Sequence, residues 1–116
     1  MSIDDGLLAW IEEALEPLGR VTRRAMMGGA TLYLDGTVFA IIADDDLWFK
    51  ADKLSDAEWD AAGCERFMFE MSGKVATMNY RRAQADVHDD ADAMRRWASL
   101  AVEAGLRAPK KRPRRF

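Results

Sequence analysis

The sequence predicts an α+β fold in which helices pack on one face of a mainly antiparallel sheet. Three observations support this prediction. Apolar residues recur at helical spacing near both ends of the chain. Between them, residues 24–50 form an apolar meander with two glycine turns, and residues 67–80 form a second pair of alternating runs around Ser72-Gly73-Lys74. The expected order of elements is α-β-β-β(-β)-α-β-β-α.

Length and composition indicate one globular domain. A chain of 116 residues can bury a core without disulfides. Apolar residues make up 49% of the sequence and charged residues 32%, which is typical of soluble proteins. No apolar run approaches the ~18 residues of a membrane span, and the acidic residues 1–6 do not resemble a secretory signal. We therefore expect a cytoplasmic protein that does not contact a membrane.

The first helix is predicted from Asp4 or Asp5, which can cap it, to Pro17 and Gly19, which end it. Trp10 is expected beside the apolar stripe, half-buried. The stripe itself comprises Leu7, Leu8, Ile11, Leu15 and Leu18.

The meander begins with a weak strand over residues 20–27, followed by a turn or bulge at Gly28-Gly29. Paired glycines also occur in phosphate-binding loops. A Walker loop would continue with Gly-Lys-Ser/Thr, and a dinucleotide fingerprint would have a third glycine. Neither follows here, so the glycines indicate a structural turn.

Asp35-Gly36 predicts a two-residue hairpin in which Leu34 opposes Thr37 and Leu32 opposes Phe39. One face of this hairpin would hold Leu32, Leu34, Phe39 and Ile41. The other face would hold Tyr33, Val38, Ala40 and Ile42. Because both faces are apolar, residues 38–43 are predicted to form a central strand covered on both sides. We expect helices to cover the first face, and a protein partner or a second copy to cover the second.

Three groups have side chains capable of metal binding or catalysis. Asp44-Asp45-Asp46 lacks the alternating ligands and the glycine of a calcium loop, so a solvated turn is expected. Cys64 is the only cysteine and His88 the only histidine, which excludes a disulfide or a multi-histidine site within one chain. We expect Cys64 to be structural, His88 to be solvated and the protein to need no cofactor.

The second half of the chain contains two predicted helices. Ser55 and Glu58 have the spacing of a capping box, with Leu54 and Trp59 as a hydrophobic staple. Gly63 would close this short helix. The last helix is expected to begin near three aspartates and to end near Gly105, with a stripe comprising Met94, Trp97, Ala98, Ala101 and Val102.

Charge is distributed unevenly along the chain. Residues 1–106 carry 11 basic and 20 acidic residues, a net charge of −9, whereas residues 107–116 carry six basic residues and no acidic one. We expect residues 1–106 to form the domain and residues 107–116 a disordered tail. The tail is either a solvated segment or a nucleic-acid contact made by Arg107, Lys110, Lys111, Arg112, Arg114 and Arg115.

Residues 24–52 read Arg-x-Met-x-Gly-Gly-x-x-Leu-Tyr-x-Asp-Gly-x-x-Phe-Ala-x-Ile-x-Asp-Asp-x-Leu-x-Phe-Lys-x-Asp, a pattern that resembles the amino-terminal domain of the TfoX/Sxy family. The likeness extends over about residues 16–106. Met27 stands where the family commonly has Phe, and Trp48 where it commonly has Tyr. The resemblance implies an α+β architecture like that of secretion chaperones, a role as an accessory factor in transcription that regulates competence, and no catalytic motif. Family members of the two-domain type carry a second, helical domain where this sequence has its basic tail.

Three hypotheses follow from the sequence. The first is a non-enzymatic module that binds a protein partner or itself and has an accessory role in transcription. An alternative is a nucleic-acid-binding protein that uses its tail together with Arg81 and Arg82, against which the acidic body would act by repulsion. The third and least favoured is an enzyme or small-molecule-binding domain.

Overall fold

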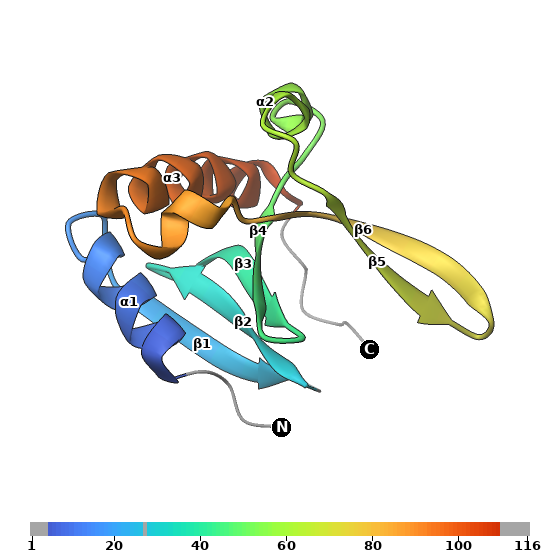
Figure 1. The fold of residues 1–116 in the computed structure, drawn as a ribbon, viewed down its shortest axis with the longest axis horizontal. Helices are drawn as coiled ribbons and strands as arrows, with labels where there is room; N and C mark the ends of the chain where they lie inside the picture. The colour runs from blue at the N-terminus through green and yellow to red at the C-terminus, as the bar shows by residue number, and fades with distance from the viewer. Residues whose placement is uncertain (1–4, 27, 110–116) are drawn as a thin grey trace, which may run out of the picture.

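The computed structural model describes residues 5–26 and 28–109 and has an α+β fold (Figure 1). The predicted order of elements is confirmed, with one short 3₁₀ helix added before the last helix. The elements are α1 (Asp5–Leu15), β1 (Val21–Met26), β2 (Gly29–Leu34), β3 (Thr37–Ala43), β4 (Asp46–Lys50), α2 (Asp56–Ala61), β5 (Arg66–Met71), β6 (Lys74–Arg82), η1 (Ala85–His88) and α3 (Ala91–Arg107).

The six strands form one antiparallel sheet in the order β1-β2-β3-β4-β6-β5. The first four strands follow one another as a meander. The chain then passes through α2, and β6 rather than β5 pairs with β4. As a result β5 is an edge strand, and the hairpin β5–β6 projects away from the rest of the molecule (Figure 1).

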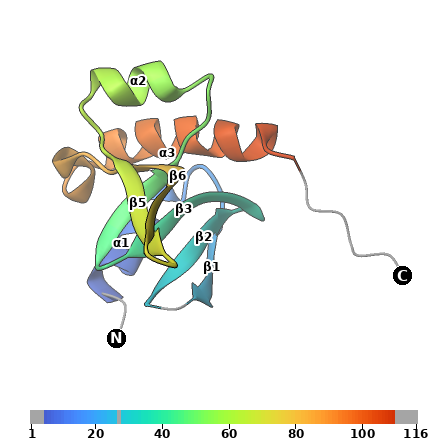
Figure 2. The ribbon, with the colours of Figure 1, turned by 90° about the vertical axis from the view of Figure 1, so that its right-hand side faces the viewer.

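Helices α1 and α3 pack against each other, and α3 crosses β3 and β4. The core lies between these helices and the sheet. Helix α2 lies beyond α3, away from β1 and β2 (Figure 2). It joins the core through Trp59, whose ring centroid is 5.6 Å from that of Phe49 and 4.7 Å from that of Trp97. One row of aromatic rings therefore connects β4, α2 and α3.

The predicted register of the first hairpin is correct at the turn and wrong beyond it. Leu34 opposes Thr37 and Tyr33 opposes Val38, but the register then shifts and Leu32 opposes Ala40. The cause is a β-bulge, which places Phe39 in β3 as an extra residue. On β3, the residues after the bulge therefore point to the face of the sheet opposite to the one that uninterrupted alternation predicts.

This shift changes the composition of both faces of the sheet. Ala40 and Ile42 belong to the core that faces the helices, and no more than 1% of either residue is exposed. Ile41 instead lies opposite Thr31 and Trp48, on the face turned away from the helices. The prediction that Ala40 and Ile42 share a face with Tyr33 is therefore wrong.

The start of α2 also differs from the prediction. Ser55 makes no side-chain hydrogen bond to the first turn of the helix. Instead, Asp52 Oδ1 accepts a hydrogen bond from the Ser55 N–H at 3.1 Å, and Ser55 Oγ accepts one from the Asp52 N–H at 3.0 Å. This reciprocal pair lies three residues earlier than the predicted Ser55 and Glu58 box. Leu54 is exposed while Trp59 is buried, so they form no staple.

The ends of the other helices agree more closely with the sequence. Trp10 is half-buried, as expected, and its Nε1–H donates to the Val87 carbonyl at 2.7 Å. Asp90 caps α3 by accepting hydrogen bonds from the N–H groups of Asp92 and Ala93. Leu18, the last member of the predicted first stripe, lies beyond the end of α1 and is exposed.

Candidate interaction surface

The face of the sheet turned away from α1 and α3 is here called the outer face. Cross-strand partners share a face, so the register places Ile41 beside Trp48, Trp48 beside Arg82, and Lys50 beside Tyr80. On β2, Thr31 and Tyr33 belong to the same face, opposite Arg24 and Thr22 of β1. The outer face therefore combines aromatic and basic side chains from β1, β2, β4 and β6 with apolar side chains from β3.

Aromatic side chains close part of the outer face. The Trp48 and Phe67 ring centroids lie 5.0 Å apart in an edge-on arrangement, and the Arg82 guanidinium lies 5.8 Å from the Trp48 ring centroid. Ile41 is buried among the described residues without a second chain. We expected a second chain to cover this whole face. Near its centre no second chain is needed, because side chains of the same chain already bury Ile41.

Of the four predicted interface residues, only Tyr33 and Val38 remain on the surface. They oppose each other across β2 and β3, and both are half-buried. Ala40 and Ile42 lie in the core, as described above. An interface role for Tyr33 and Val38 stays a prediction.

Exposed apolar side chains gather on the hairpin β5–β6. Met68, Met71, Val75 and Met78, here called the hairpin surface, are each between 38% and 68% exposed. They are four of the eight large apolar residues that are exposed in the described part of the chain. No other pair of strands gathers as many.

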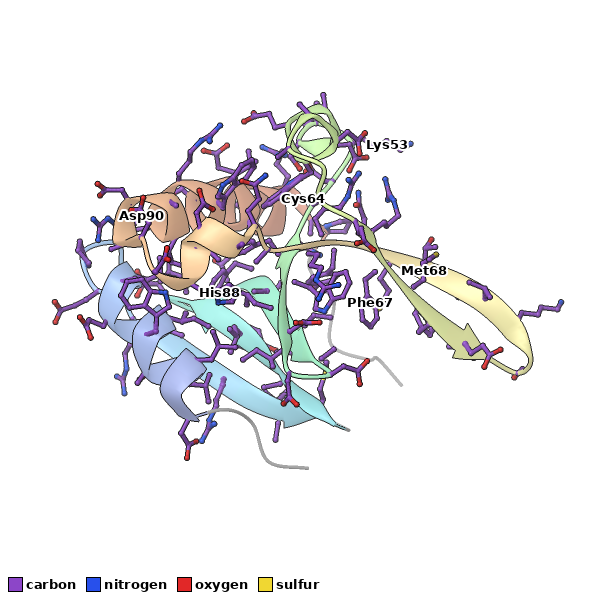
Figure 3. All side chains as sticks on the ribbon, viewed as in Figure 1. Lys53, Cys64, Phe67, Met68, His88 and Asp90 are labelled. Carbon is purple, nitrogen blue, oxygen red and sulfur yellow. The ribbon has the colours of Figure 1, made fainter. Side chains whose placement is uncertain are left out.

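The hairpin surface has two sides. Met78 opposes Phe67, whereas Met68 opposes Thr77 and Val75 opposes Glu70. Phe67 and Met68 accordingly leave opposite sides of β5 (Figure 3). A protein that covered this hairpin would find apolar side chains on both of its sides.

The two edges of the sheet differ in polarity. At one edge, β1 carries Arg23 and Arg24, and charged side chains of this kind hinder pairing with another strand. At the other edge, the middle of β5 reads Phe67-Met68-Phe69. The edge at β5 thus offers backbone hydrogen-bonding groups together with apolar side chains.

A buried arginine anchors the base of the hairpin to α2. Arg81 is 2% exposed, and its guanidinium donates to Asp60 Oδ1 at 2.6 Å, Asp56 Oδ1 at 2.9 Å and the Cys64 carbonyl at 3.1 Å. Asn79 completes the network by donating to Asp56 at 3.0 Å and accepting from Arg81 Nε at 3.2 Å. These bonds tie the base of the projecting hairpin to α2.

The structure does not bring the candidate catalytic groups together. Cys64 is buried, and burial raises the pKa of its thiol, which disfavours the reactive thiolate. His88 is exposed at the end of η1. Asp44 and Asp45 have positive φ angles in the turn between β3 and β4, as predicted for a solvated turn. Within residues 5–26 and 28–109, no three His, Cys, Asp or Glu side chains are placed to hold a metal ion.

The basic tail is described only at its start. Arg107 is the last residue of α3, and its Nε and Nη2 donate to the two carboxylate oxygens of Asp52 at 2.7 and 2.9 Å. Hydrogen bonds from Arg107 and from Ser55 outweigh the effect of burial and lower the pKa of Asp52 to about 2. The other candidate nucleic-acid contacts are Lys110, Lys111, Arg112, Arg114 and Arg115, which lie outside the described residues.

The structure describes the other two arginines of the nucleic-acid prediction, Arg81 and Arg82. Arg81 is enclosed by the polar network and is not accessible to a ligand. Arg82 is exposed but forms an ion pair with Asp46 at 3.0 Å.

None of the described helices is both long and apolar enough to cross a membrane.

Sequence reasoning predicted the second hairpin but not its exposed apolar surface. A signal was present, because Met68, Met71, Val75 and Met78 fall on both sides of an alternating pattern that has few charges. Read alone, that pattern is equally typical of a strand buried on both faces. The strand order settles the matter by placing the hairpin at the edge of the sheet.

The fold and this surface define a small α+β domain with one open antiparallel sheet and an exposed apolar hairpin. Residues 13–105 match the TfoX N-terminal domain, and the chain belongs to this family. The resemblance seen in residues 24–52 is thereby confirmed.

Two relatives share this similarity. The chain is 33% identical over 66 residues to the DNA transformation protein TfoX1 of Aliivibrio fischeri, a match that covers 57% of the chain and 32% of the relative. It is 26% identical over 101 residues to the protein Sxy of Escherichia coli, covering 83% of the chain and 46% of that relative. The matches thus span 32% and 46% of the length of these relatives, less than half of each.

Proposed function

We propose that this domain is a non-enzymatic protein-interaction module that serves the regulation of DNA transformation. It contacts its partner, another protein or a second copy, through the hairpin surface. The exposed apolar side chains of β5 and β6 carry the proposal. Membership of the TfoX family and the name of the relative from Aliivibrio fischeri support the link to transformation.

The energetics favour covering this hairpin. Burial of one fully exposed Val or Met side chain stabilises a contact by about 1.5–3 kcal/mol. The four residues are 38–68% exposed, so each can contribute roughly that fraction and together they offset part of the cost of association. Methionine side chains adapt to irregular partner surfaces. An extended segment that added itself to β5 would gain backbone hydrogen bonds as well.

The geometry of the hairpin also suits recognition. Because Arg81 ties its base to α2, the hairpin is held in one orientation before a partner arrives. Preorganisation of this kind reduces the entropy lost on binding. An anchored, projecting hairpin is therefore consistent with the proposed contact.

The test compares a hairpin variant with a matched control in the source organism. Met68→Glu/Val75→Glu places two charges on one side of the hairpin, at positions already exposed to water. Leu18→Glu/Leu54→Glu makes the same charge change at exposed apolar residues elsewhere, outside the groove at the end of α3. We expect deletion of the chain to lower the frequency of DNA transformation, and we expect the control but not the hairpin variant to restore it.

Equal restoration by both variants would show that the hairpin surface is not the functional contact. Thermal unfolding of the two purified variants gives the necessary check on folding. We expect both to unfold within a few degrees of the parent, because substitutions of exposed residues usually change stability by about 0.5 kcal/mol or less.

Nucleic-acid binding is a second candidate function. One observation of the structure favours it beyond the charge of the tail: basic and aromatic side chains occur together on the outer face. The acidic body acts against it, because long-range repulsion lowers the local concentration of a polyanion. Any nucleic-acid contact must therefore depend on a local arrangement of cations.

A further inference from the structure

A groove lies where the outer face meets the carboxyl-terminal end of α3. Its volume is about 750 Å³, within the range of about 300–1,000 Å³ typical of ligand sites. The sheet contributes Arg24, Tyr33, Lys50 and Tyr80 to one wall. Leu106 and Pro109 contribute to the other.

The two basic side chains of the groove have no acidic partner. Within residues 5–26 and 28–109, neither Arg24 nor Lys50 forms an ion pair, and Lys50 Nζ lies 5.2 Å from the centroid of the Tyr80 ring. Asp35 also lines the groove, but its Oδ1 accepts a hydrogen bond from the Arg20 N–H at 2.9 Å. With two basic side chains and one acidic side chain, the groove has a net positive charge on a body whose net charge is negative.

The tyrosines add flat surfaces and hydrogen-bond donors. Tyr80 is 8% exposed, and its hydroxyl has no hydrogen-bond partner in the described part of the chain. Tyr33 is half-buried beside it. Burial, together with the neighbouring Tyr33, raises the pKa of Tyr80, so its hydroxyl keeps its proton at neutral pH.

The sequence that follows the groove is also basic. Ala108 and Pro109 line the groove, and the next six positions hold Lys110, Lys111, Arg112, Arg114 and Arg115. In the sequence, five cations thus follow directly after the wall of the groove.

We propose that this groove binds single-stranded nucleic acid, with phosphate held by Arg24 and Lys50 and a base placed against Tyr33. Arginine and lysine neutralise phosphates, and aromatic rings stack with bases regardless of their sequence. The chain length beyond Pro109 and its charge favour a strand over a free mononucleotide. This site is separate from the hairpin surface and does not depend on the contact proposed there.

The test measures binding of a fluorescent twelve-residue oligothymidylate to the full chain at several salt concentrations. Arg24→Gln/Lys50→Gln is the groove variant. The matched control, Arg23→Gln/Lys74→Gln, removes the same charge from the opposite side of β1 and from the tip of the hairpin. Circular dichroism and thermal unfolding check that both variants keep the fold.

We expect the groove variant to bind about tenfold more weakly than the parent and the control to bind like the parent. Loss of two phosphate contacts should also reduce the slope of log K against log salt by about 1.4. Tyr33→Leu, which keeps the apolar bulk but removes the ring, should weaken binding about fivefold or more. The hairpin variant Met68→Glu/Val75→Glu changes the net charge of the protein by −2, as the groove variant does, but on the hairpin rather than in the groove. We expect it to bind no more weakly than the control.

Three results would overturn the proposal. One is the absence of binding by the parent chain. A second is equal weakening in the groove variant and the control, which would assign binding to net charge or to the tail alone. The third is binding of thymidine monophosphate as tight as that of the oligomer, which would indicate a small-molecule site. Failure of any kind here leaves the hairpin proposal unaffected, because its test uses other residues and another readout.

Discussion

Arg81 is a buried cation whose charge is compensated by two aspartates of α2. Its guanidinium reaches Asp56 and Asp60 on α2 from within β6. Removing one member of a buried ion pair leaves the other without compensation. Asp60 is largely exposed, so water can solvate it after such a change, whereas Asp56 is more enclosed.

We predict that Arg81→Met destabilises the fold by about 3 kcal/mol, at the lower end of the range for a broken buried pair. Arg82→Met is the matched control, because Arg82 is the next residue and its ion pair with Asp46 is exposed. That control should cost less than about 1 kcal/mol. Urea unfolding measures both changes, and equal effects would mean that the network around Arg81 does not anchor the hairpin.

Asp52 gives the fold a specific sensitivity to acid. Its pKa is about 2 in the folded protein against 3.8 for an unperturbed carboxyl, so the unfolded chain binds more protons between these values. The stabilisation is present above about pH 4 and is lost as the pH falls towards 2.

We predict that Asp52→Asn lowers the unfolding temperature at pH 7 and reduces its fall between pH 4 and pH 2. Asparagine keeps an oxygen that can accept the hydrogen bond from the Ser55 N–H, so this substitution isolates the contribution of the charge. Thermal unfolding at a series of pH values measures the effect. The prediction fails if both proteins show the same dependence on pH over this interval.

At the scale of single residues, the sequence predicted roles that depend on local spacing. Asp35-Gly36 forms the expected turn, and Trp10 is half-buried as expected. The sequence could not predict that Ser55 would pair with Asp52 rather than Glu58, because both pairs have the same spacing and similar local chemistry. The choice between them depends on Arg107, which is distant in sequence and also binds Asp52.

Helix α3 is the element whose position depends most on close approach to the sheet. A Cβ atom on Gly105 would collide with the carbonyl oxygen of Val38 and lie 2.9 Å from Thr37 Cγ2. Because the first of these atoms belongs to the backbone of β3, it cannot rotate away. The helix would have to move outward.

We predict that Gly105→Ala destabilises the protein by about 2 kcal/mol, although alanine is the better helix former by about 1 kcal/mol. Ser99→Ala, within the same helix, is the control and should be nearly neutral or slightly stabilising. Chemical unfolding compares them. Stabilisation by Gly105→Ala would contradict the close packing of α3 on β3.

At the scale of elements, the three α-helices and six strands could be predicted from periodicity and capping signals, the 3₁₀ helix η1 could not, and the pairing of the strands could be predicted only in part. The bulge at Phe39 was not predictable, because residues 38–43 are apolar at every position and either register satisfies the pattern. The same uniformity led us to place Ala40 and Ile42 at an interface. Only the packing of α3 against β3 distinguishes the two faces.

For the whole molecule, the sequence predicted the fold class and the family but not the surface that we propose to be functional. Exposure of the hairpin surface follows from the strand order, in which β6 pairs with β4 and leaves β5 at the edge. No local pattern specifies that order. The candidate surface therefore emerges only when all six strands are assembled.

The central claim is that the hairpin surface contacts another protein, and crosslinking in living cells tests it most directly. A photoreactive amino acid replaces Val75 on the hairpin or, as the control, Leu54 at a similarly exposed position. After illumination, mass spectrometry identifies what is attached. We predict that Val75 crosslinks to one defined protein, or to a second copy of this chain, and that Leu54 does not. Absence of a specific crosslink at Val75, or the same products at both positions, would contradict the account.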